Sequence, residues 1–303
     1  MRGAAKRSEA LTVPSGVLVR LRPLLPDELF EGYVGQLISE NGLTDQEALL
    51  RCLQPSPDPR PPLKKLSFDQ RLALGLAQEI EIRVDFLIRE HSLLPLIGLL
   101  WPSWAACTCL AGHVREWRLC PICVEEDLGF RGISYWRRMH QLHGVTWCLK
   151  HKAPLVAPMR SLKRLADVSP GASLMAGVQP VVGPSAGNRD VARYAAILVA
   201  LLENAHRPLD RGLVAQALRA QLSCFAEAPC ADLPPEWLGR FLDSGYETDE
   251  PGQAAQVDRF LFRNSRTTTA FNLAAVMALL WKDADRAVSD ILTVQPVERQ
   301  AEN

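Results

Sequence analysis

The chain has no excess of charge of either sign, because 34 Lys and Arg residues balance 34 Asp and Glu residues. A protein that binds nucleic acid through its overall field carries a basic excess, so any such binding here has to come from a local patch. The sequence also lacks a run of about 18 apolar residues, which argues against a membrane-spanning helix. Residues 1–25 lack the apolar centre of a secretory signal. We therefore expect a cytoplasmic protein whose cysteines are reduced.

The motifs of several enzyme classes are missing as well. The chain has no G-x-x-x-x-G-K-[ST] loop for nucleotide phosphates and no H-E-x-x-H pair of a zinc protease. A zinc deaminase needs P-C-x-x-C, but Leu119 precedes Cys120 here. A zinc-supported nuclease stays open as a minor alternative, with His140 and His143 between the cysteine pairs and Asp127 as the nearest carboxylate. No His-Asn-His order surrounds them, so we expect a protein that is not an enzyme.

Two short pairs of metal-ligating residues stand out against these absences. Cys120-Pro121-Ile122-Cys123 is followed, after residues 124–147, by Cys148-Leu149-Lys150-His151. This spacing lets both side chains of one tight turn face the same ion, and three thiolates with one imidazole complete a tetrahedral zinc site. The alternative is a set of buried free cysteines that share the spacing by chance. We predict a closed, structural zinc site rather than a catalytic one.

A second set of ligand types lies close by. Cys107 and Cys109, with His113 further on, form half of a candidate second zinc site, which His140 or His143 would complete. The C-x-C spacing is less typical of zinc than C-x-x-C, and apolar packing is the alternative. The remaining cysteines have no matching partners and are predicted to bind no metal; they are Cys52, Cys224 and Cys230.

The region around the two pairs is locally basic. Residues 107–165 hold ten Lys and Arg residues against four acidic residues, a difference of +6. Between the pairs lies Tyr135-Trp136-Arg137-Arg138, in which Trp136 is expected in the core, as is Trp147. Basic side chains here are candidates for contact with nucleic-acid phosphates or a partner protein, the alternative being simple solvation. They are Arg115, Arg118, Arg137, Arg138, Lys150 and Lys152.

Apolar periodicity and capping residues predict a mainly α-helical protein, in which helix-turn-helix-like units flank a small zinc-finger or zinc-ribbon module. We expect helices from Asp27 to Glu40, after Thr44, from Ser67 to Gln78, and from Ile82 to Glu90. Each of the two helix pairs is compatible with a helix-turn-helix or an ordinary hairpin. Further helices are expected at about 190–205, 210–222, 234–243 and 272–281.

These elements divide the chain into six predicted parts. They are a flexible N-terminal arm (1–22), a helical part (23–104), the zinc module (105–164), a linker rich in Gly, Pro, Ser and Ala (165–189), a C-terminal helical domain (190–294) and a disordered tail (295–303).

Three segments together resemble the signature of the TniQ family. They are Arg118-Leu119-Cys120-Pro121-Ile122-Cys123, then Tyr135-Trp136-Arg137-Arg138-x-His140-Gln141-Leu142-x-Gly144-Val145, and then Cys148-x-x-His151-x-x-x-Leu155. The segment from Arg22 to Tyr33 is similar to the start of that domain, although members usually carry Glu-Ser where this chain has Glu28-Leu29. The resemblance covers about 20–160 well and the rest loosely.

The resemblance implies a bacterial, transposon-encoded protein that selects target sites without catalysing strand transfer. It implies helix-turn-helix units, zinc fingers and the four zinc ligands Cys120, Cys123, Cys148 and His151. The partners implied are target DNA, a CRISPR effector complex in one branch, and an AAA+ ATPase regulator that engages the transposase. Members of the CRISPR-linked branch often form homodimers. A sequence-specific DNA-binding regulator built from the same parts is the alternative.

Overall fold

The protein is described here from a computed structural model of its 303 residues. The structure describes residues 10–12, 18–53, 67–100, 117–159, 175, 177–181, 187, 189–206, 208–223 and 269–293. These residues are mainly helical, with two small two-stranded sheets, which confirms the predicted fold class. None of the described helices combines the length and apolar character needed to cross a membrane.

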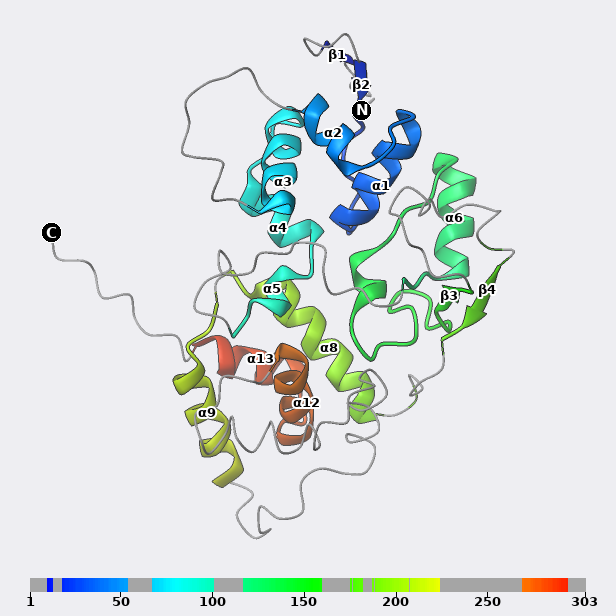
Figure 1. The fold of residues 1–303 in the computed structure, drawn as a ribbon. Helices are drawn as coiled ribbons and strands as arrows, with labels where there is room; N and C mark the ends of the chain where they lie inside the picture. The colour runs from blue at the N-terminus through cyan, green and yellow to red at the C-terminus, as the bar shows by residue number, and fades with distance from the viewer. Residues whose placement is uncertain are drawn as a thin grey trace, which may run out of the picture. The chain divides into compact units, whose positions relative to one another are not determined.

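The chain forms two compact units, each built from several segments. The first consists of residues 1–92, 108–138 and 155–180, and the second of residues 93–107, 139–154 and 181–303. Four helices of the first unit follow one another along the chain (Figure 1): α1 (Phe30–Glu40), α2 (Gln46–Cys52), α3 (Phe68–Glu79) and α4 (Val84–His91). Each of them packs against the next, α1 on α2, α2 on α3, and α3 on α4.

Helix α1 buries the apolar face that the sequence predicts, with Tyr33 and Leu37 fully inside. Its predicted start is wrong, because Asp27 is not the cap: the helix begins at Phe30, and Leu29 holds the N-cap position without a side-chain bond. The segment before it is extended instead, and Asp27 has a φ of 59°. The predicted end is confirmed, since Asn41 caps the helix and Gly42 follows with a φ of 62°.

The extended segment pairs with a distant part of the same unit. The Leu29 N–H donates to the Trp136 carbonyl at 2.8 Å, and the Arg138 N–H donates to the Asp27 carbonyl at 2.8 Å. Trp136 is 1% exposed, as predicted for a core residue, and it packs over Gly32 of α1. This pairing fixes residues 136–138 to the start of α1.

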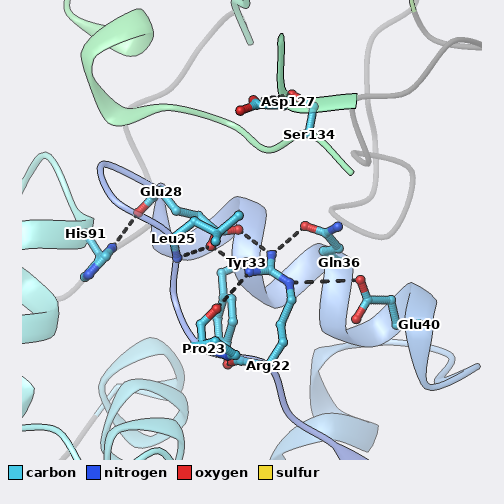
Figure 2. A network of polar contacts seen from close by, with 10 residues as sticks. All are labelled: Arg22, Pro23, Leu25, Glu28, Tyr33, Gln36, Glu40, His91, Asp127 and Ser134. Carbon is cyan, nitrogen blue, oxygen red and sulfur yellow. Dashed lines mark hydrogen bonds and ion pairs between the residues drawn. The ribbon is translucent and has the colours of Figure 1, made fainter. Parts of the chain in front are cut away.

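A buried polar network surrounds Glu28, which is 0% exposed (Figure 2). Its carboxylate accepts hydrogen bonds from the Arg22 guanidinium at 2.8 Å and from the Leu25 N–H at 2.9 Å. The Tyr33 hydroxyl donates to the Arg22 carbonyl at 2.6 Å. His91 of α4 places Nδ1 2.8 Å from the Glu28 carbonyl, and its burial lowers its pKa. The network ties the N-terminal segment to α1 and α4.

Helix α3 begins as predicted. Ser67 accepts a hydrogen bond from the Gln70 N–H, and the Gln70 side chain accepts one from the Ser67 N–H, which completes a capping box. Residues 80–83 then turn the chain into α4, with Glu81 in the left-handed conformation at a φ of 56°. Asp45, through its bond to the Ala48 N–H, caps α2.

The strands are short. β1 (Ala10–Thr12) pairs antiparallel with β2 (Leu18–Arg20), and β3 (Val156–Pro158) pairs antiparallel with β4 (Val178–Pro180). β4 falls within the segment that the sequence suggests is a linker.

The second unit contains α5 (Leu94–Ile97), α8 (Arg189–Asn204), α9 (Arg211–Ser223), α12 (Ala270–Leu280) and α13 (Ala284–Thr293). α8 packs against α5, α12 and α13 (Figure 1). The predicted helix at about 190–205 is confirmed as α8, and the predicted helices at 210–222 and 272–281 are confirmed as α9 and α12. The predicted helix at 234–243 lies outside the described residues.

Sequence analysis did not predict α13. Asp283 caps this helix by accepting a hydrogen bond from the Arg286 N–H at 2.8 Å. Its apolar stripe is narrow, because only Ala287, Val288 and Ile291 are buried along it. Three apolar residues give a weak periodic signal, so the pattern of this mostly polar segment did not indicate a helix.

Candidate metal centre

Helix α6 (Pro121–Arg131) positions the first ligand pair. Cys120 is the extended residue before the helix, and Pro121 occupies its first turn, where a fixed φ and a missing N–H are favourable. Cys123 follows in the same turn, so both thiols lie at the N-terminal end of the helix. Backbone pairing also holds Cys120, because its neighbour Leu119 exchanges two hydrogen bonds of 2.9 Å with Val156.

A tight turn positions the second pair. The Lys152 N–H donates to the Cys148 carbonyl at 2.8 Å, and the Cys148 N–H donates to the Ala153 carbonyl at 2.8 Å. Lys152 takes the left-handed conformation, with a φ of 56°. The His151 N–H points at the Cys148 sulfur, 3.5 Å away. The turn therefore directs the Cys148 thiol and the His151 ring to one side.

The four side chains form one cluster. The ligand atoms of Cys120, Cys123, Cys148 and His151 all lie within 4.8 Å of one another. Each cysteine is at most 1% exposed. Tetrahedral zinc has ligands at about 2.0–2.3 Å, which places the ligand atoms about 3.3–3.8 Å apart, close to this arrangement. Three sulfurs and one imidazole nitrogen are donors that zinc accepts, so the residues fit a closed zinc site.

Asp127 lies one turn after Cys123 on the same helix and organises a second polar group. Its carboxylate accepts two hydrogen bonds from Arg137, at 2.8 and 2.9 Å, and one from the Ser134 hydroxyl at 2.9 Å. Arg131 donates a further bond at 3.0 Å. We call these four residues the Asp127 cluster. Asp127 is 3% exposed, so the cluster is built around a buried carboxylate.

The Arg137 guanidinium is held on two sides. Its carbon lies 4.2 Å from the centre of the Tyr135 ring, while its nitrogens bind Asp127. Burial by itself lowers the pKa of Arg137, but the hydrogen bonds to Asp127 and the nearby Tyr135, Asp127 and Cys123 raise it above its ordinary value. Arg137 therefore stays charged in this position.

The other residues predicted to contact nucleic acid or a partner differ in their surroundings. Arg138 is 4% exposed and donates to the Arg89 carbonyl and the Asp27 carboxylate. Arg118 is 9% exposed, whereas Lys150 and Lys152 are exposed. Arg115 lies outside the described residues. The structure thus engages Arg137 and Arg138 within the first unit and leaves the two lysines at the surface.

The candidate second zinc site falls mostly outside the described part of the chain, which does not include Cys107, Cys109 or His113. His140 is 4% exposed in a short 3-10 helix, Arg138–Gln141. The His143 ring lies 5.2 Å from the Phe271 ring. Among the residues that the structure describes, only the Cys120, Cys123, Cys148 and His151 group gathers ligand atoms in this way.

Sequence analysis names Glu28 and Asp127 but did not predict that these two carboxylates organise buried hydrogen-bond networks. The spacing of four residues after Cys123 is a signal for Asp127, because such residues share a face when the segment is helical, but no helix was predicted there. Glu28 had no such signal, since its partners Arg22, Leu25 and His91 are set by the extended path of the chain.

Comparison with known proteins agrees with this arrangement. The TniQ family model matches residues 19–155, a span that contains the Glu28 network, the Asp127 cluster and all four candidate ligands. No curated protein matches the chain. The chain therefore carries a TniQ family domain over residues 19–155.

Proposed function

We propose, from the TniQ family domain over residues 19–155, that the protein is a non-catalytic adaptor in transposon targeting. It would link target DNA, or a CRISPR effector complex bound to DNA, to the AAA+ ATPase regulator that engages the transposase. The observation that carries the proposal is the assembly of Cys120, Cys123, Cys148 and His151 into one cluster inside that domain.

The cluster supports a structural rather than a catalytic role. Four protein ligands would fill the tetrahedral positions of a zinc ion, whereas catalytic zinc keeps a position open for water or substrate. The three cysteines of the cluster are buried. Zinc held here would stabilise the fold of the module and leave its outer surfaces to meet partners.

One of these surfaces is the exposed face of α6. Phe130 is 84% exposed and Ile122 is 41% exposed, and both lie on this helix with the exposed residues Glu125 and Glu126. Aromatic side chains are enriched at protein interfaces, and the two carboxylates would repel DNA phosphates. This face would suit a protein that offers an apolar pocket with basic residues at its rim, and the ATPase regulator is the partner proposed to contact it.

Direct recognition of a DNA sequence is the second candidate function, and it would also fit a sequence-specific regulator. It is favoured by α3 and α4, which are joined by a four-residue turn with a left-handed residue, Glu81, as in a helix-turn-helix. The arginines of α4 and its N-cap are paired with acids, Arg83 with Asp85 and Arg89 with Glu90. This pairing leaves little net positive charge for phosphates, so we favour targeting through a protein partner.

The proposal is tested by mixing the purified full chain with the purified AAA+ ATPase of the same transposon and with duplex DNA. We expect binding to the ATPase that Phe130→Ser weakens about tenfold or more, in the range of an interface anchor. Met159→Ser is the matched control, because Met159 is also exposed, at 62%, but lies outside α6. Binding to DNA alone, with a steep salt dependence and no binding to the ATPase, would favour the regulator instead.

A further inference from the structure

The candidate metal centre carries a buried charge that needs a partner. Three thiolates and one neutral imidazole around Zn²⁺ have a net charge of about −1. Cys120, Cys123 and Cys148 are 0%, 1% and 1% exposed, so solvent does little to stabilise this charge. A buried charge is costly unless an opposite charge or hydrogen bonds offset it.

The Asp127 cluster has the opposite sign. Its two guanidinium groups, from Arg131 and Arg137, outnumber its one carboxylate, which leaves a net charge of about +1. Asp127 follows Cys123 by four residues on α6, and residues at this spacing are neighbours on a helix face. Asp127 therefore lies one helical turn from Cys123, on the same face of α6.

We propose that Asp127 positions Arg137 so that its guanidinium charge offsets the charge of the thiolate-rich zinc centre at Cys123. Asp127 and Arg137 are then outer-shell positioning residues, which strengthen zinc binding without touching the ion. The inference rests on the structural zinc of the proposed function.

The contacts of Arg137 favour this assignment over contact with nucleic-acid phosphate. Both terminal nitrogens of Arg137 donate to Asp127, and one face of its guanidinium covers the Tyr135 ring. The side chain is 17% exposed. A guanidinium that makes two hydrogen bonds to a buried carboxylate has a fixed position. This geometry suits a positive charge that has to stay next to the metal centre.

Two substitutions at Arg137 separate charge from packing. Arg137→Gln removes the charge but keeps most of the length, whereas Arg137→Lys keeps the charge and loses the two-bonded geometry. Changes to outer-shell partners of metal sites typically cost about 10–100-fold in affinity. We therefore expect Arg137→Gln to weaken zinc binding about tenfold or more, and Arg137→Lys to weaken it by less than about threefold.

The measurement is competition for zinc between the purified full chain and a chromophoric chelator of known affinity. Cobalt-loaded protein provides a second readout, since its thiolate-to-metal charge-transfer band reports the charge around the sulfurs. We expect a band shift in Arg137→Gln but not in Arg137→Lys. Arg83→Gln is the matched control, because Arg83 also pairs with an aspartate, Asp85, yet its side chain is 83% exposed at the N-cap of α4.

Each outcome decides the matter. Equal losses of affinity in both Arg137 variants, with an unchanged cobalt spectrum, would show a packing role and overturn the inference. Wild-type affinity in Arg137→Gln would overturn it too, while the zinc site itself would stand. A wild-type chain that binds no zinc would overturn both the structural zinc and the inference.

A second series covers the case in which Arg137→Gln does not fold. Arg131 belongs to the same cluster and its side chain is 32% exposed, so its substitution disturbs packing less. Arg131→Gln and Arg131→Glu lower the local charge by one and two units while Asp127 still holds Arg137. Zinc affinity that falls stepwise along this series supports the inference, and a flat series overturns it.

Discussion

Gly32 lies so close to Trp136 that a Cβ atom on Gly32 would stand 2.9 Å from the tryptophan Cβ and Cδ1 atoms. The contact joins α1 to the segment that carries Arg137 and Arg138. Because the Trp136 Cβ is tied to the backbone that pairs with Leu29, it has little freedom to move aside. We predict that Gly32→Ala lowers the free energy of unfolding by about 1–3 kcal/mol, as measured by urea denaturation.

Gly129 provides the control for this substitution. It is also helical, on α6, but a Cβ there would meet nothing within 4 Å. Gly129→Ala should therefore stabilise the protein by about 0.5–1 kcal/mol, because alanine loses less backbone entropy in a helix than glycine. If both substitutions changed stability alike, the close contact at Gly32 would have no energetic role.

Removal of the metal should unfold the module around the ligand cluster. Structural zinc contributes about 10–16 kcal/mol of apparent binding free energy in small sites. Cys148→Ser, or treatment with a strong chelator, should release about one zinc per chain and expose residues 117–159 to limited proteolysis. Zinc content measured by elemental analysis on the same sample checks the cause.

Cys52→Ser is the matched control, because Cys52 is a free, half-buried cysteine on α2. It should keep both the metal and the protease resistance. Cys148→Ser protein that retained its melting temperature and its protease resistance without metal would contradict a structural zinc site.

The clustering of the four candidate ligands and most helices could be predicted from the sequence because they depend on local spacing. The two ligand pairs each sit within one turn, so C-x-x-C and C-x-x-H encode them directly. The Ser67 cap and the existence of α8 likewise depend on residues that are close in the sequence. The predicted start of α1 was wrong because backbone hydrogen bonds with residues 136–138, more than a hundred residues away, hold Asp27 and Leu29 in an extended segment.

The roles of the basic residues depend on the same long-range contacts. In the sequence Arg137 and Arg138 form a basic pair, and no sequence pattern indicates that Asp127 and the Arg89 carbonyl are their partners. The partners come from another helix in each case, α6 for Arg137 and α4 for Arg138. Pairing of this kind is set by tertiary packing, which one sequence does not reveal.

Loss of the Glu28 charge should be strongly destabilising. Glu28 is 0% exposed and its partner Arg22 is 14% exposed, so Glu28→Gln would leave the guanidinium charge poorly compensated. Breaking a buried ion pair by removal of one partner costs about 3–5 kcal/mol. We expect a loss of this order in urea denaturation, together with loss of the contact between the N-terminal segment and α1.

The exposed pair of Arg83 and Asp85 is the matching control, since their side chains are 83% and 58% exposed. Asp85→Asn should leave the stability nearly unchanged, because solvent screens an exposed ion pair. A comparable effect of the two substitutions would mean that burial does not set the energy of the Glu28 pair.

Glu31 should make stability fall as the pH rises. It is 4% exposed on α1, and Oε2 makes no hydrogen bond within the part of the chain that the structure describes. Burial, with a smaller contribution from the charge of Asp69, raises its pKa from 4.5 to about 8. Between these values the unfolded chain releases the proton while the folded chain keeps it, so each pH unit favours unfolding by up to about 1.4 kcal/mol.

Glu31→Gln removes this titration and keeps the size of the side chain. We expect the variant to exceed the wild-type protein in melting temperature at about pH 8, with a gap that narrows steadily towards about pH 5. Glu47→Gln, at an exposed position on α2, should show no such widening between the two pH values. A gap for Glu31→Gln that stayed constant with pH would show that Glu31 is ionised in the folded protein throughout this range.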